Sequence, residues 1–272
     1  MTGLTNVAVG KAAIPALIVT VVLMLAIPVV FFICWRRKHK ERTNIGYLIA
    51  GAVGFLVSAL VLESCLHYLC LVSDNPVSRF LNGNTAAYVL YGALAAGVFE
   101  ECGRHIVLKY VLKKNRTREN AVLYGIGHGG IEVLAVVLPS MISYLAIAVL
   151  FSKGAGKEAL QALNVTEETA VAALPTVQAA AAFDWWATAL NVFERFAAMF
   201  VHIGLTVVVF YGVVKAKKGY LPLAILLHAA TDTVPALYQR GVVPLWPVEL
   251  WAALWTAAVV LLAVRLYRKL QA

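Results

Sequence analysis

Seven apolar runs divide this chain, and they restrict its fold more than any other feature. They cover roughly residues 12–35, 46–70, 86–112, 121–151, 185–214, 221–238 and 247–267. About 20 consecutive apolar residues are enough to cross a bilayer as a helix. The sequence therefore predicts an all-α, polytopic membrane helix bundle with about seven transmembrane helices.

Composition supports a membrane protein and argues against nucleic-acid binding. Hydrophobic residues make up 61% of the chain and charged residues only 14%, whereas soluble domains are about 45–50% apolar. The net charge of +9 is divided among short clusters between the apolar runs, so it does not form one patch for a nucleic-acid partner. We expect no nucleic-acid partner and an integral membrane location, the bacterial cytoplasmic membrane.

The basic clusters predict the orientation of the chain. Most of the 23 lysine and arginine residues lie in four connections or ends, within 36–42, 109–118, 215–218 and 265–269. Cytoplasmic loops are enriched in these residues, and the four segments fall on one side of a seven-helix path. The N-terminus is thus predicted outside and the C-terminus in the cytoplasm.

We expect residues 1–272 to form a single integral membrane domain, because neither a linker nor an internal repeat interrupts the runs. The long connection 152–184 falls outside the membrane in the predicted orientation. There Asn164 precedes Glu167 by three positions, as at the start of a helix. A surface helix or a re-entrant segment is therefore predicted within the alanine-rich run 170–182.

Ionisable residues inside the apolar runs are the strongest functional signal. Glu100, Glu101 and Arg104 lie inside the run 86–112, where charge is costly and marks function more often than not. Their spacings of three and four residues place acids and arginine on one helix face. A structural ion pair between helices is the alternative explanation.

Further ionisable residues lie at the same depth in three other runs. Counted from the cytoplasmic end of each run, Glu101, Glu132 and Asp232 are 11 residues deep and His202 is 12 deep; Arg104 is 8 deep, and His128 and His228 are 7 deep. His128 with Glu132, and His228 with Asp232, are also spaced four residues apart. The four helices can close on one cavity in the cytoplasmic half, although four nearby glycines also make His128's helix suited to close packing.

These residue types suit hydrolysis of a peptide bond. Two adjacent carboxylates in a low dielectric do not both ionise easily, so Arg104 is expected to keep one charged while the other exchanges protons with water. Such a group can act as a general base and later protonate the leaving amine. His202, or His228 oriented by Asp232, can stabilise the oxyanion.

At these residues the chain resembles the glutamic-type intramembrane proteases, the superfamily of CAAX prenyl proteases, bacteriocin-processing enzymes and PrsW-like proteases, and within it the YhfC-like family. The resemblance covers about 86–238. It rests on Glu100-Glu101-x-x-Arg104, on Gly127 to Glu132, on Arg195 with His202, and on His228-x-x-x-Asp232. It implies a glutamate pair that activates water, with the other polar residues supporting water and oxyanion. Two residues, not three, separate the glutamate pair from Arg104, and Asp232 stands where CAAX proteases have Asn, so prenylated substrates are not implied.

The predicted function is an intramembrane endopeptidase that cleaves a membrane-embedded or lipid-anchored protein or peptide. Its expected site comprises Glu100, Glu101, Arg104, His128, Glu132, His202, His228 and Asp232. No cofactor is expected in this reading; the alternative is a zinc protease that binds the ion through His128, His202 and His228 with a carboxylate. A proton- or cation-coupled transporter and a non-catalytic scaffold are the other hypotheses. The bilayer is the expected surrounding, and no oligomeric state is predicted.

Overall fold

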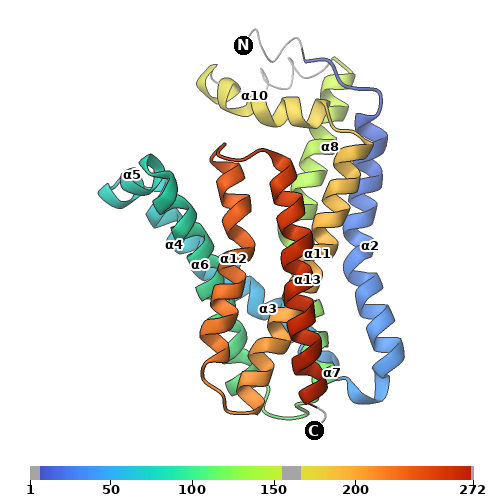
Figure 1. The fold of residues 1–272 in the computed structure, drawn as a ribbon. Coiled ribbons are helices and arrows are strands. Elements are labelled where there is room, and N and C mark those ends of the chain that lie inside the picture. The colour runs from blue at the N-terminus through green and yellow to red at the C-terminus, as the bar shows by residue number, and fades with distance from the viewer. Residues whose placement is uncertain (1–6, 155–166, 271–272) are drawn as a thin grey trace. The chain divides into compact units, whose positions relative to one another are not determined.

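The computed structural model describes residues 7–154 and 167–270, and these form helices without a strand (Figure 1). The α-helices are α2 (Ala13–His39), α3 (Ile45–Phe55), α4 (Ser64–His67), α5 (Pro76–Gly83), α6 (Thr85–Ile106), α7 (Arg118–Glu132), α8 (Leu138–Ser152), α10 (Glu167–Ala181), α11 (Trp185–Val214), α12 (Tyr220–Gln239) and α13 (Leu245–Lys269). A 3₁₀ turn, η1 (Lys40–Arg42), follows α2. The predicted fold class is confirmed.

Six helical stretches of the described chain are long and apolar enough to cross a membrane. They are Ala13–Arg42, Ile45–Val72, Arg118–Ser152, Trp185–Val214, Tyr220–Gln239 and Leu245–Lys269. The sequence predicted a seventh span at 86–112, and that segment is helical as α6. It is absent from the six because Glu100, Glu101 and Arg104 reduce its hydropathy. That α6 is the seventh span stays a prediction.

Wide π-helical turns interrupt three of the long segments. They are η2 (Leu56–Glu63), η3 (Tyr68–Val72), η4 (Val107–Val111) and η5 (Val133–Val137). Such turns are uncommon and often occur beside functional sites. Here η4 directly follows α6, η5 directly follows α7, and η2 packs against α6. Three of the four turns therefore adjoin the two helices that carry most of the expected site residues.

The chain divides into two compact units, residues 1–27 with 133–195, and residues 28–132 with 196–272. In the first unit, α10 packs on α8, where Val177 contacts Ile147 and Phe151. Thr20 there donates from Oγ1 to Thr188 Oγ1 at 3.0 Å. A helix is present there as α10, its position at the membrane surface stays a prediction, and Asn164 lies outside the described residues. That residues 1–272 act as one membrane domain stays a prediction.

The second unit contains all eight expected site residues, and glycines allow its helices to approach closely. A Cβ at Gly127 would lie 2.0 Å from the Leu48 oxygen of α3, and one at Gly125 would lie 2.6 Å from the Ile203 Cα of α11. A Cβ at Gly97 would lie 2.7 Å from the Ile225 oxygen of α12. Only glycine permits these contacts, so α7 sits against α3 and α11, and α6 against α12.

The basic connections of the second unit gather at one of its ends. The loops after α2, α6 and α11 and the C-terminal end of α13 lie together there (Figure 1). Tyr47 donates from its hydroxyl to the Lys114 oxygen at 2.7 Å, and Arg118 stacks over the Tyr267 ring at 4.4 Å. This grouping agrees with the charge pattern, while the assignment of that end to the cytoplasm stays a prediction.

Candidate functional site

Arg104 is the central cation of the site and binds one member of the glutamate pair. It is fully buried, and its Nη1 donates to both carboxylate oxygens of Glu101, at 2.5 and 2.6 Å. Glu101 also accepts a hydrogen bond from His228 Nδ1 at 2.7 Å. Glu101 is therefore held between two donors on α6 and α12, and its oxygens are already engaged.

Glu100 points to a different set of partners, three histidines from three helices. Its Oε2 lies 2.9 Å from His128 Nε2 on α7 and 3.8 Å from His202 Nδ1 on α11, and its Oε1 lies 3.9 Å from His228 Nε2 on α12. Only the first of these distances is a hydrogen bond. Glu100 is thus surrounded by imidazoles but retains acceptor capacity that Glu101 lacks.

The hydrogen bonds determine the tautomer of His202. Arg104 Nη2 lies 3.2 Å from His202 Nδ1, and a guanidinium can only donate. Nδ1 must therefore be unprotonated, and the ring hydrogen is on Nε2, which donates to Glu132 Oε2 at 2.5 Å. Glu132 orients His202 on the neighbouring helix, instead of pairing with His128 four residues before it.

Asp232 and His128 complete the cluster at opposite extremes of exposure. Asp232 Oδ2 lies 3.6 Å from His228 Nε2, and the aspartate side chain is 36% exposed, more than any other carboxylate of the site. His128 is fully buried, and its Nδ1 has no hydrogen-bond partner among the described residues. Asp232 is therefore the carboxylate at the edge of the cluster, although its Oδ2 is buried.

All eight residues expected from the sequence come together within the second unit. The structure adds two aromatic neighbours of His128 that the sequence reasoning missed: Tyr124 stacks at 6.1 Å between ring centroids, and Phe55 meets the ring edge-on at 5.2 Å. The four-residue spacing of Tyr124 and His128 could have revealed the first. Phe55 belongs to another helix, and no signal in the sequence pointed to it.

Other membrane-buried polar residues lie outside the cluster. Glu63 Oε1 is 3.1 Å from His67 Nε2, and His67 Nδ1 is 2.9 Å from the Tyr91 hydroxyl. Arg195, part of the motif set quoted above, belongs to the first unit, where its Nη2 lies 3.6 Å from Glu194 Oε2. Within the described residues, the Glu63–His67 pair forms no hydrogen bond or ion pair with Glu100.

Three side chains of the cluster are placed so that they could hold a metal ion. One ligand atom each from Glu100, His128 and His202 lie within 4.8 Å of one another, and imidazole nitrogens with a carboxylate oxygen are the ligands zinc prefers. His202 has the carboxylate partner on its second nitrogen that usually orients a metal-bound imidazole, whereas His128 Nδ1 lacks one in the described chain. The set fits a divalent cation in type and spacing.

The helices and the cluster define an integral membrane protein with a buried group of glutamate, histidine and arginine side chains. More specifically, the chain belongs to the YhfC family: residues 23–252 match the family described as "YhfC intramembrane metalloprotease". It is also 29% identical over 238 residues to "Uncharacterized membrane protein YhfC" of Bacillus subtilis (strain 168), covering 86% of this chain and 88% of that protein. No solved structure matches the chain. The family description supports a protease and the expected membrane location.

Proposed function

We propose that the chain is an intramembrane endopeptidase in which Glu100 activates water to attack a peptide bond of a membrane-associated substrate. The observation that carries this proposal is the division of labour between the two adjacent glutamates. Glu101 is engaged by Arg104 and His228, whereas Glu100 faces three imidazoles and keeps acceptor capacity. Glu100 is the base in this proposal, and Glu101 is a positioning residue.

The proposed reaction uses Glu100 as the base and His228 as the donor to the oxyanion. Glu100 removes a proton from a water molecule while the water oxygen bonds to the scissile carbonyl carbon. The same carboxyl then donates that proton to the amide nitrogen as the C–N bond breaks and the amine leaves. His228 is the donor proposed for the oxyanion. Protonated on both ring nitrogens, it would keep its Nδ1 donation to Glu101 and present an Nε2 donor between Glu100 and Asp232. Glu132 keeps His202 in the tautomer whose Nδ1 accepts a hydrogen bond from Arg104.

The family description favours a metal-assisted form of the same reaction. Glu100, His128 and His202 would hold the ion, and a bound zinc would polarise the carbonyl and make water more acidic. In this structure Arg104 donates a hydrogen bond to His202 Nδ1, the ring nitrogen that faces Glu100. Because one lone pair cannot serve both, that hydrogen bond and metal ligation through Nδ1 are mutually exclusive.

The proposal is tested by comparing membrane proteomes of cells that carry the wild type or Glu100→Gln, with labelling of new protein N-termini. We expect cleavage products of a membrane-associated protein in the wild type and their loss, by about 100-fold or more, in Glu100→Gln. Glu63→Gln is the matched control, because Glu63 is also buried and also contacts a histidine. Unchanged cleavage in Glu100→Gln would refute the proposal.

The role of metal is decided by a second measurement on the purified protein. About one zinc per chain in the wild type, reduced in His202→Ala, together with loss of cleavage on chelation, would establish the metal-assisted form. Full cleavage by metal-free protein would establish the glutamate-only form. Either result keeps Glu100 essential, so the two measurements answer separate questions.

A further inference from the structure

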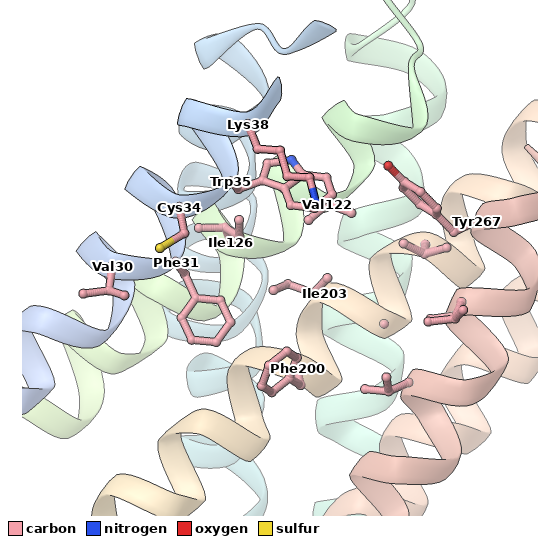
Figure 2. Close-up of a pocket in the computed structure, with 15 residues that line it drawn as sticks. Val30, Phe31, Cys34, Trp35, Lys38, Val122, Ile126, Phe200, Ile203 and Tyr267 are labelled. Carbon is pink, nitrogen blue, oxygen red and sulfur yellow. The ribbon is translucent and has the colours of Figure 1, made fainter. Parts of the chain in front are cut away.

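A groove lies on the second unit, away from the glutamate–histidine cluster, and is called here the α2–α13 groove. Its volume is about 620 Å³. It is lined by α2, α7, α11 and α13, and the close-up shows its side chains converging from these helices (Figure 2). Val122, Ile126 and Ile203 are among its apolar lining residues. None of the eight site residues lines it.

The groove is accessible from the lipid side of the helices. Val30, Phe200 and Val264 line it and are 50%, 43% and 41% exposed. In a membrane, apolar side chains exposed at this depth contact acyl chains. Cys34, also exposed, lies on the same wall (Figure 2). A hydrocarbon chain can therefore enter sideways without crossing a polar barrier.

One end of the groove is polar and positively charged. Lys38 and Trp35 lie at that end, with Phe200 toward the other (Figure 2). Trp35 donates from Nε1 to the Glu119 oxygen at 3.0 Å, and the Glu119 carboxylate contacts Arg42 and Arg118 at 3.5 and 3.2 Å. Lys38 is exposed and forms no ion pair or hydrogen bond within residues 7–154 and 167–270. The Lys38 ammonium group therefore lies at one end of the apolar α2–α13 groove without a counter-charge in the described residues.

The volume of the α2–α13 groove is compared with two possible occupants, a transmembrane substrate helix and a small lipid-like ligand. A membrane-spanning helix of 20 residues is about 30 Å long and 10 Å wide, which corresponds to roughly 2,400 Å³. The groove is about a quarter of that volume and falls in the range of about 300–1,000 Å³ that small ligands occupy. The groove can therefore take up a single acyl chain along its length, whereas a substrate helix could lay only part of one face against it.

We propose that the α2–α13 groove binds an anionic phospholipid, with an acyl chain along the apolar wall and the phosphate beside Lys38. The charge complementarity is the same as in basic pockets between transmembrane helices that bind anionic headgroups. The acyl chain of a zwitterionic lipid would fill the apolar part of the α2–α13 groove equally well, but its headgroup would place no net negative charge beside Lys38. The inference does not depend on the proposed proteolysis, because the groove and the cluster share no residue.

The test measures lipid binding to the purified full-length chain in detergent by native mass spectrometry and thermal shift. The probes are dioleoylphosphatidylglycerol and dioleoylphosphatidylcholine, which share acyl chains and differ in net charge. We expect retention of the anionic lipid at concentrations where the zwitterionic lipid is lost. Equal retention of the two lipids would overturn the proposal.

Variants locate the binding site. Lys38→Gln is expected to weaken binding of the anionic lipid about fivefold, and Lys38→Arg to preserve it. Lys113→Gln removes an exposed lysine that does not line the groove, and it should bind like the wild type. Val30→Trp narrows the groove and should reduce retention of both lipids. Equal losses in Lys38→Gln and Lys113→Gln would show general charge attraction and overturn the assignment to this groove.

Discussion

Removing Arg104 provides the most direct test of how the site is held together. Arg104 and Glu101 are both fully buried, and two short hydrogen bonds join them. Arg104→Met leaves the Glu101 carboxylate buried without its main counter-charge. Breaking one partner of a buried ion pair costs about 3–5 kcal/mol, so we expect a loss of stability in that range.

A double-mutant cycle separates the interaction from the loss of packing. Glu101→Gln alone should also destabilise, because it leaves the Arg104 guanidinium without a carboxylate. The double variant leaves neither charge unpaired, so it should be more stable than the sum of the single effects predicts. We expect a coupling free energy of at least about 2 kcal/mol, measured by unfolding in mixed detergent micelles with tryptophan fluorescence.

The exposed pair Asp74–Arg79 is the control for this cycle. Its side chains are 88% and 63% exposed, and such surface pairs contribute about 0–1 kcal/mol. The same cycle with Asp74→Asn and Arg79→Met should therefore give a coupling below about 1 kcal/mol. If the Arg104–Glu101 coupling is no larger than this value, the buried pair does not organise the site and our reasoning is wrong.

Two other predictions follow from the contacts around the site. Glu132→Gln should lower cleavage about 10–100-fold with little change in melting temperature, because it removes the carboxylate that orients His202; an unchanged rate would exclude this orienting role. Gly127→Ala should destabilise by about 1–3 kcal/mol or more, because its Cβ would clash with the Leu48 oxygen. Gly92→Ala is the control, because nothing lies within 4 Å of a Cβ at Gly92. It should change neither the free energy of unfolding nor the expression level.

The sequence by itself determined the helical membrane fold and singled out the eight residues that the structure brings together. Apolar length decides where helices cross a bilayer, and nothing about tertiary packing is needed for that step. Counting residues along each run also put Glu101, His202 and Asp232 at one depth, because the rise of a helix is constant. The same counting did not detect the π-helical turns, and it overestimated the apolar character of α6.

Only the tertiary structure decided which side chains are partners. Spacing within one helix paired His128 with Glu132, whereas the structure pairs His128 with Glu100 and Glu132 with His202. The pairing of Arg104 with Glu101, three residues apart on one helix, is the exception that spacing had allowed. Periodicity gives the face on which a residue lies, but the neighbour of that face depends on how the helices are rotated and how closely they approach. At α7 that approach is controlled by glycines, and it is therefore a property of the assembled unit.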